Sequence, residues 1–505
     1  MERHGTAPRG QLTLAEVVAD AARRFGDRAA IVAPDGWSVS YTQLERASND
    51  VASGLVQRGV GPGDVVGLLL PSSPEYLVAY VAAAKIGAVT AGINPRLSPE
   101  QRRATLRVAA PSLVIATEDL AVEGAPETAV VELSDSATAC LPELRGEPPA
   151  VVPRPADDAP VAIVFTSGTT GSPKGAVFCL RQLRAIADLD VGDRHDGGTP
   201  MLVSTELVHV GVMTKLPWYL RTGSTLHLLR RWRADDALRV ISEQRVTSIG
   251  AIAPQIALML RSPDFDSYDL SAVQTIVAGG AASPPALVAE ARERFGATYS
   301  IRYSSTESGG VGTATAFDAD DSEALHTVGR PRRGVQVRIT DNDGAPLPPG
   351  EPGTVWLRSA AVMERYWRDP DATATTLVDG WLRSDDLGVV GDDGCLRLVG
   401  RRSDTFVRGG YNVHPQTVEA ALNLHPGVRE AAVIGVADAI MGHIGAAVVV
   451  ARDGHPPPSL DDLRTFAAHH LAHHELPQRL EIVGELPRTA VDKIDRAALR
   501  RLLGP

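Results

Sequence analysis

The chain has 505 residues, of which 44% are hydrophobic and 22% are charged, a composition typical of a globular enzyme with more than one domain. Its formal net charge of −11 lacks the basic footprint on which nucleic-acid binding depends, so we expect no nucleic-acid partner. Its three cysteines are widely spaced and form neither a disulfide framework nor a zinc-binding pattern, which favours a reducing cytoplasm.

Helical and strand-like segments alternate from about residue 12 to residue 130. The spacing of apolar residues predicts helices over 13–25, 41–59 and 74–87. Short apolar runs predict strands over 29–34, 65–71 and 89–94. This βαβ rhythm indicates a largely parallel sheet that is covered by helices.

The alternation resumes after residue 160 and changes character twice. Strands and helices again follow one another as far as residue 296, whereas shorter and more antiparallel strands are expected between 327 and 400. A unit with its own helix and strand pattern begins after Arg401 and is large enough for a small core. The predicted fold class is therefore α/β, with a large multi-sheet N-terminal domain and a small α+β C-terminal domain.

No segment is typical of a signal peptide or of a membrane span. The N-terminal stretch is charged and has no uninterrupted apolar core. The most apolar stretches are interrupted by Lys85, or by Asp438 and His443, before they reach the ~20 residues that a bilayer requires. We expect a cytoplasmic protein without a membrane span, either a monomer or a homodimer.

One loop predicts phosphate binding. Residues 161–176 read VAIVFTSGTTGSPKGA, an apolar strand followed by glycines, hydroxyl side chains and one lysine, Lys174. Successive backbone N–H groups in such a loop can form a concave anion site, and glycines allow a close approach. The loop departs from the P-loop pattern because Pro173 precedes the lysine and Gly175 follows it, so a kinase or P-loop NTPase is disfavoured.

Five segments in order resemble the adenylate-forming superfamily, which includes acyl-CoA synthetases, peptide-synthetase adenylation domains and luciferases. They are TSGTTGSPKG, YSSTE (303–307), GWLRSDDLG (380–388), GRRSDTFVRGGYNVHPQTVE (400–419) and PRTAVDKIDR (487–496). The resemblance covers nearly the whole chain. It implies an adenylation domain at 1–401, a hinge at 402–404 and a mobile C-terminal domain at 405–505.

The resemblance also implies roles for residues that would bind MgATP. Tyr303 would stack on adenine, and Asp386 and Arg401 would hold the ribose. Thr306 would contact the α-phosphate, and Glu307 would help to hold Mg²⁺, the hard cation that lets a carboxylate lie beside phosphate oxygens. The triphosphate would be held by Thr166, Ser167, Gly168, Thr169, Thr170, Gly171 and Lys174.

Further roles concern the acid, the chemistry and the acceptor. His209 would wall the acid-binding pocket, and the turn at Gly279 and Gly280 would lie against the acyl-adenylate. Lys493 would stabilise charge where the acid meets the α-phosphate. The glycines that would line the pantetheine channel of coenzyme A are Gly409 and Gly410. Candidates for the acyl pocket, of which at least two are expected to be core or surface residues, are Met213, Lys215 and Trp218.

Three positions depart from the superfamily pattern. Asp385 and Asp492 replace glycines next to the ribose-binding aspartate and the adenylating lysine, and Ser403 replaces the usual Asp or Lys of the hinge. Four histidines form two pairs, each spaced by four residues, which could place both members of a pair on one helix face. This spacing suggests a metal site, but no third ligand type accompanies the histidines. We expect no metal other than Mg²⁺. The four are His469, His470, His473 and His474.

The sequence therefore predicts an ATP-dependent acid–thiol ligase that forms an acyl-adenylate, releases pyrophosphate and then makes an acyl-CoA thioester. Two alternatives keep the fold: transfer of the acyl group to a carrier protein, or activation of nitrite for diazotisation of an aryl amine. A third alternative is an inactive nucleotide-binding homologue. Four retained residues argue against that loss: Glu307, Asp386, Arg401 and Lys493.

Overall fold

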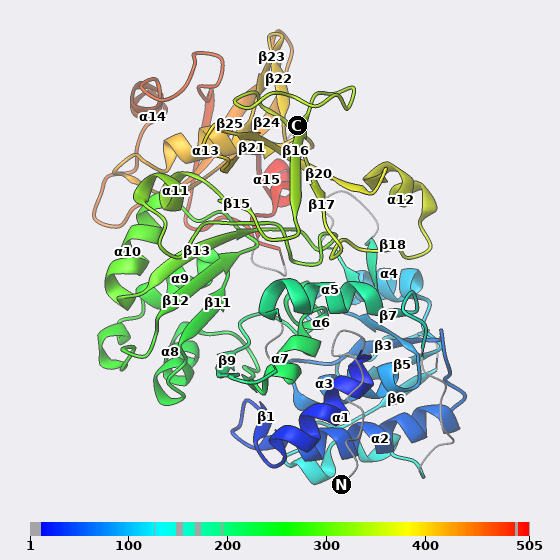
Figure 1. The fold of residues 1–505 in the computed structure, drawn as a ribbon. Coiled ribbons are helices and arrows are strands. Elements are labelled where there is room, and N and C mark those ends of the chain that lie inside the picture. The colour runs from blue at the N-terminus through cyan, green and yellow to red at the C-terminus, as the bar shows by residue number, and fades with distance from the viewer. Residues whose placement is uncertain are drawn as a thin grey trace.

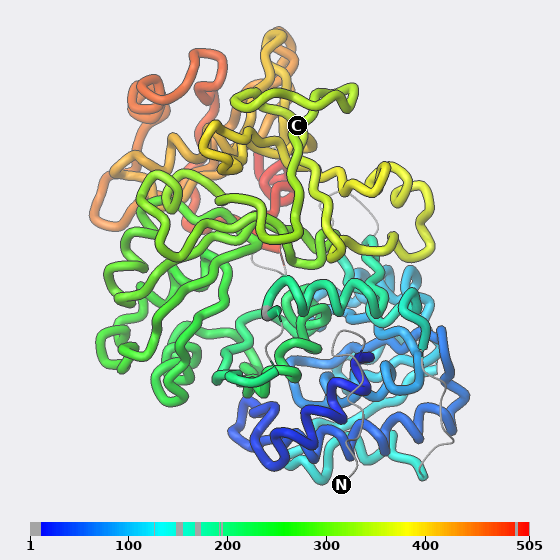
Figure 2. The backbone as a smooth tube through the Cα atoms, in the orientation of Figure 1, coloured from blue at the N-terminus to red at the C-terminus, as the bar shows by residue number. Residues whose placement is uncertain are grey.

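The computed structural model describes residues 12–125, 127–147, 155–166, 173–192, 195–489 and 493–503. Over these ranges the strands form five sheets, four in a large N-terminal unit and one in a smaller C-terminal unit (Figure 1). The chain passes from the blue and cyan part at the bottom of the view to the orange and red part at the top (Figure 2). The α/β fold class expected from the sequence is confirmed.

The phosphate-type loop belongs to a sheet of seven strands with the order β18-β8-β7-β4-β3-β5-β6. Strands β3 to β7 pair in parallel, and β8 and β18 add an antiparallel edge. The strands are β3 (Val65–Leu69), β4 (Val89–Gly92), β5 (Leu113–Ala116), β6 (Thr128–Val130), β7 (Pro160–Phe165), β8 (Gly175–Cys179) and β18 (Arg365–Tyr366). The accompanying helices are α2 (Tyr41–Gln57), α3 (Pro74–Lys85), α4 (Pro99–Ala109) and α5 (Leu180–Val191).

Two further sheets complete the α/β part of the large unit. One has the order β2-β1-β10-β9, and in the other β11, β12 and β13 are parallel, with β14 and β15 at an antiparallel edge. The strands are β1 (Ala29–Val32), β2 (Ser38–Ser40), β9 (Pro200–Leu202), β10 (Thr225–His227), β11 (Ser248–Ala251), β12 (Thr275–Gly279), β13 (Thr298–Tyr303), β14 (Thr313–Ala314) and β15 (Arg330–Pro331). The helices are α1 (Leu14–Phe25), α6 (Val210–Met213), α7 (Leu216–Thr222), α8 (Ala234–Glu243), α9 (Ala253–Leu260), α10 (Pro285–Phe295) and α11 (Asp321–His326).

The antiparallel strands expected between 327 and 400 form the fourth sheet. It has the order β16-β17-β20-β19, and β21 pairs with β20. Its elements are β16 (Gln336–Thr340), β17 (Gly353–Arg358), α12 (Pro370–Thr376), β19 (Leu377–Val378), β20 (Trp381–Val390) and β21 (Leu396–Arg401).

The C-terminal unit is built on the long hairpin of β24 and β25. Strand β24 pairs with one edge of β25, and β22 and β26 pair with different parts of its other edge, at Gly442 and at residues 446–450. Helices cover the sheet (Figure 1). Its elements are β22 (Phe406–Arg408), β23 (Tyr411–Val413), α13 (Pro415–Leu422), β24 (Val428–Asp438), β25 (Gly442–Ala451), α14 (Leu460–Ala467), β26 (Arg479–Val483) and α15 (Arg496–Leu503).

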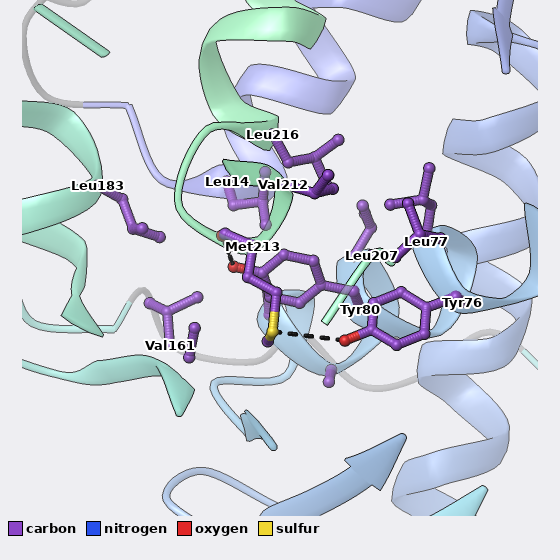
Figure 3. Close-up of a cluster of buried hydrophobic side chains, with 14 of the residues drawn as sticks. Leu14, Tyr76, Leu77, Tyr80, Val161, Leu183, Leu207, Val212, Met213 and Leu216 are labelled. Atoms are coloured by element: carbon purple, nitrogen blue, oxygen red, sulfur yellow. Dashed lines mark hydrogen bonds between the residues drawn. The ribbon is translucent and has the colours of Figure 1, made fainter. Parts of the chain in front are cut away.

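A buried cluster fixes the segment that carries His209 (Figure 3). The Tyr76 hydroxyl donates to Met213 Sδ at 3.4 Å, and the Tyr80 hydroxyl donates to the Met213 carbonyl at 2.6 Å. A Cβ at Gly92 would lie 2.6 Å from the Tyr76 oxygen, so only glycine fits there. Met213 is fully buried, and it is therefore a core residue rather than part of an acid pocket.

Two expectations about the chain's helices are settled by the described residues. Helix α14 ends at Ala467, so His469, His470, His473 and His474 follow it and do not share a helix face. No cluster of His, Cys, Asp and Glu among the described residues could hold a metal ion. Nor does this part of the chain contain a helix with the length and apolarity needed to cross a membrane.

One largely buried arginine links three segments of the C-terminal unit. Arg496, at the start of α15, contacts Asp404 Oδ2 at 3.1 Å and Glu419 Oε1 at 2.9 Å, and it donates to the Val433 carbonyl at 2.6 Å. Burial raises the pKa of Glu419, and Arg496 opposes that shift. The arginine therefore neutralises two carboxylates that would otherwise be buried without a counter-charge.

We expect Arg496→Ala to destabilise the C-terminal unit by about 3–5 kcal/mol, because it leaves buried carboxylates unpaired. Native-state hydrogen exchange of the β24 and β25 amides measures this opening free energy. Arg429→Ala is the control, since Arg429 lies 4.0 Å from the exposed Asp453, and it should cost no more than about 1 kcal/mol. Equal protection in the two variants would contradict the prediction.

Candidate active site

The base of the phosphate-type loop is a β-hairpin. Phe165 lies opposite Gly175 on the antiparallel strands β7 and β8, and the Thr166 N–H donates to the Lys174 carbonyl at 2.9 Å. Both predicted residues at the ends of the loop are therefore positioned by strand pairing. The predicted loop residues that lie outside the described residues are Ser167, Gly168, Thr169, Thr170 and Gly171.

Tyr366 connects the loop to Glu307. Its hydroxyl donates to Glu307 Oε1 at 2.7 Å, and Lys174 Nζ lies 5.3 Å from the centre of its ring. Burial, followed by the negative charge of Glu307, raises the pKa of Tyr366, so the phenol remains a neutral donor. No motif marks Tyr366 in the sequence; its position follows from the pairing of β18 with β8.

The residues predicted to hold the nucleoside meet at Asp386. Asp386 and Arg401 lie opposite each other on β20 and β21, with Arg401 Nε 3.2 Å from Asp386 Oδ1. The Tyr303 hydroxyl donates to Asp386 Oδ2 at 2.8 Å. Tyr303 is buried, and this burial together with Asp386 raises its pKa. Each carboxylate oxygen keeps a further lone pair with which it can accept a ribose hydroxyl.

The turn of β12 and the loop of Thr306 lie at one edge of a sheet. Gly279 ends β12 opposite Arg302 on the parallel strand β13, and Gly280 follows with a φ of 75°. The segment with Thr306 begins directly after β13, and the Thr306 carbonyl accepts from the Gly309 N–H at 3.0 Å. Ligands of open α/β sheets bind at the carboxyl ends of such strands.

Lys493 reaches this edge from the C-terminal unit. Its carbonyl accepts a hydrogen bond from the Thr489 N–H at 2.7 Å. Although Lys493 is an exposed residue, its pKa is lowered, chiefly by desolvation and then by Arg401, while Asp386 and Glu307 oppose the shift. The lysine thus lies within electrostatic reach of residues from three separate motifs.

His209 is close enough to Lys493 to feel its charge. Burial lowers the pKa of His209 to about 4, with further contributions from the positive charges of Lys493 and Arg96. The imidazole is therefore neutral at physiological pH and can wall a pocket without repelling a cation.

Gly409 and Gly410 are not brought to this site. They form the turn between β22 and β23, with φ values of 55° and 89°, and Figure 1 places that hairpin at the end of the C-terminal unit remote from β7. In this arrangement Lys493, and not these glycines, lies near the residues predicted to bind the nucleotide.

Two of the three departures from the superfamily pattern contact each other. The Ser403 hydroxyl donates to Asp385 Oδ2, and Arg402 Nε lies 3.8 Å from Asp385 Oδ1. The Arg402 N–H also donates to the Asp385 carbonyl at 2.8 Å. The aspartate that replaces a glycine is thus tied to the segment expected to be the hinge. The third departure, Asp492, lies outside the described residues.

The remaining pocket candidates have partners within the large unit. Lys215 Nζ lies 2.7 Å from Asp190 Oδ2, and the Trp218 ring lies 4.0 Å from the ring of Tyr219. Both residues lie at the start of α7, and these side-chain contacts are with residues of the same unit.

The fold and the placement of Lys493 define an enzyme of the adenylate-forming class. Residues 18–367 match the family described as AMP-binding enzyme, and residues 417–493 match the AMP-binding enzyme C-terminal domain. The chain belongs to the AMP-binding enzyme family, whose members here are acyl-CoA and acyl-carrier ligases that act through an adenylate.

Three similar proteins illustrate the family. The fatty acid–[acyl-carrier-protein] ligase ScoC of Streptomyces coeruleorubidus is 32% identical and covers 92% of each chain. A feruloyl-CoA synthase of an Amycolatopsis species is 32% identical over 95% of this chain and 97% of its own. The o-succinylbenzoate CoA synthetase of Bacillus subtilis, solved with its acyl-adenylate intermediate, is 26% identical, covers 96% of this chain and 97% of its own, and has a TM-score of 0.83.

We expect adenylate formation to fall as pH rises through the pKa of Lys493, because only the ammonium form stabilises the developing charge. That pKa is lowered, so the loss should begin below the pH at which an ordinary lysine deprotonates. Because His209 stays neutral, the pH–rate profile should show no further change in rate between about pH 5 and 8. ATP–pyrophosphate exchange measures the profile. An alkaline limb that persists unchanged in Lys493→Arg would contradict this assignment.

We expect Asp385→Gly to loosen the segment at 402–404, because the contacts with Ser403 and Arg402 are lost. Tryptic cleavage after Arg402 should become about two- to fivefold faster, as befits an exposed interaction worth up to about 1 kcal/mol. Ser403→Ala should have a similar effect, and the double variant should show less than the sum of the two. Asp392→Asn, in an exposed turn, is the control. Additive effects would show that the two residues act independently.

Proposed function

We propose that the chain is an ATP-dependent acid–thiol ligase that uses this site for two half-reactions. The observation that carries the proposal is the position of Lys493, which comes from the C-terminal unit and lies within reach of His209, Glu307 and Asp386. Residues of the N-terminal motifs and a lysine of the C-terminal unit thus lie close enough to act on one ligand. The domain limits 1–401 and 405–505, with a hinge at 402–404, are part of the proposal.

In the first half-reaction a carboxylate oxygen attacks the α-phosphorus of ATP, and pyrophosphate leaves. Tyr303, Asp386 and Arg401 hold the nucleoside, so the α-phosphate is presented in line to the acid. Thr306 and Lys493 supply donors where negative charge accumulates. The leaving pyrophosphate is held by Thr166, Ser167, Gly168, Thr169, Thr170, Gly171 and Lys174.

Glu307 would hold the Mg²⁺ that accompanies ATP. Its Oε1 accepts from Tyr366, and Oε2 makes no hydrogen bond with a described residue, so a hard oxygen ligand remains for the cation. Bound there, Mg²⁺ would neutralise charge on the phosphates. Tyr366 orients the carboxylate by fixing one of its two oxygens.

In the second half-reaction the C-terminal domain turns about residues 402–404. This motion withdraws Lys493 and brings Gly409 and Gly410 toward the adenylate, where they line the path of a pantetheine thiol. The thiol attacks the acyl carbon and AMP leaves. We propose coenzyme A as the thiol, in keeping with the feruloyl-CoA synthase among the relatives.

A carrier protein is the second candidate acceptor. It is favoured by the similarity to ScoC, whose name specifies an acyl-carrier-protein ligase and which covers 92% of this chain. The two acceptors present the same pantetheine thiol. They differ in the rest of the molecule, which would contact the enzyme surface. Thioester assays with free coenzyme A and with a holo acyl carrier protein separate them.

We expect Lys493→Ala to reduce adenylate formation by about 10²- to 10³-fold, the effect of losing one preorganised charge donor. Conversion of a supplied acyl-adenylate to the thioester should remain within about threefold of wild type, because Lys493 has left the site by then. Pyrophosphate release and single-turnover thioester formation measure the two steps. Equal loss in both would contradict the two-arrangement mechanism.

The proposal as a whole is tested by a pyrophosphate-release screen over aliphatic, aryl and nitrite substrates. Release of AMP and pyrophosphate with any acid supports ligase chemistry, whereas ADP as product would overturn it. Binding of ATP without turnover of any substrate would indicate an inactive homologue.

A further inference from the structure

A charged network lies behind the loop that carries Glu307. Asp190, at the end of α5, accepts from Lys215 Nζ at 2.7 Å and from Arg332 Nη1 at 2.8 Å. A Cβ at Gly310 would lie 3.5 Å from Lys215 Cε, which places the lysine stem directly against that loop. The network therefore lies where the segment after His209 packs against residues 303–310.

Arg302 extends this network to the edge of the sheet. It immediately precedes Tyr303, and its Cα pairs with that of Gly279 on the parallel strand β12. The Cβ that Gly279 lacks would lie 3.5 Å from Arg302 Cβ, so the arginine side chain leaves the sheet on the side where Gly279 has none. The Gly279–Gly280 turn is where the proposed acyl-adenylate would lie.

Arg302 has no anionic partner within the part of the chain that the structure describes. Among the described residues it makes no hydrogen bond or ion pair, and its guanidinium lies 5.4 Å from the ring centre of Phe317. Its pKa is lowered to about 10, chiefly by burial and then by the positive charge of Arg332, while Asp190 opposes the shift. Asp190 is already shared by two cations, so one carboxylate faces three positive groups. A half-buried cation in such surroundings is stabilised when an anion binds it.

We propose that the acid activated by this chain carries a second carboxylate, remote from the one that is adenylated, and that Arg302 binds it. This inference rests on the proposed ligase function and names its substrate class. A guanidinium can receive a carboxylate through two parallel hydrogen bonds, which gives both affinity and orientation. Lys215 and Arg332 would add positive potential without direct contact.

The chemistry also sets a direction for the substrate. If the reacting carboxylate lies beside Lys493 and the remote one beside Arg302, only one end of the molecule meets ATP. A monocarboxylic acid of the same length would leave Arg302 without a partner and would bind more weakly.

The test compares α,ω-dicarboxylic acids of increasing length with monocarboxylic acids of the same length, by pyrophosphate release. We expect at least one dicarboxylic acid to have a higher kcat/KM than its monocarboxylic counterpart. Arg302→Gln should raise the KM for that dicarboxylic acid about 10- to 100-fold, as for loss of a charged hydrogen-bonding partner, and change monocarboxylic acids less than about twofold. Arg302→Lys should restore part of the loss.

Arg24→Gln is the matched control. Arg24 also lies over an aromatic ring, 4.7 Å from the centre of Phe25, but it belongs to α1. It should leave the preference between the two acid series unchanged. ATP binding by each variant establishes that the large unit is folded.

The outcomes separate this inference from the function on which it rests. Turnover of uncharged-tail acids with no preference for dicarboxylic acids would overturn the inference and leave the ligase intact. Turnover of nitrite or acetate alone, with longer acids accepted only after Arg302→Gly, would show that Arg302 closes the pocket, and it would also overturn the inference. No turnover of any acid, despite ATP binding, would defeat the proposed function itself.

Discussion

The pairing of Asp386 with Arg401 across β20 and β21 is the constraint on which the rest of the site depends. The strand register places the two side chains opposite each other, and Tyr303 reaches the same carboxylate from a different sheet. Arg401 is also the last residue of β21, so the chain leaves this pair directly into residues 402–404. The residues proposed to hold the nucleoside are therefore joined directly, through Arg401, to the start of the C-terminal unit.

Much of the fold and part of the site could be predicted from the sequence because the relevant patterns are local. The βαβ alternation indicated parallel strands, and each motif is short and contiguous. Tyr366 could not be found in this way, since its place beside Glu307 arises from the pairing of β18 with β8 across 190 positions of chain, a relation that no local pattern records.

The charged residues near the proposed acid-binding region could not be predicted from the sequence, for a different reason. Four separate segments of the chain contribute these residues, and each residue has an unremarkable sequence context: Asp190 lies in α5, Lys215 directly before α7, Arg302 in β13 and Arg332 directly after β15. Only tertiary packing shows that a single carboxylate serves two cations and that Arg302 is left over. The four histidines show a limit of local patterns: their spacing is that of one helix face, but α14 ends at Ala467 and they follow it.

Arg496 has a consequence for how the enzyme fails. It lies three residues after Lys493 and neutralises the carboxylates that hold the C-terminal unit together. Damage that unfolds this unit therefore also displaces Lys493, the lysine that we propose assists adenylation. A molecule of the proposed ligase with an unfolded C-terminal unit would therefore stop consuming ATP. It would not form reactive adenylates that it could no longer transfer to a thiol.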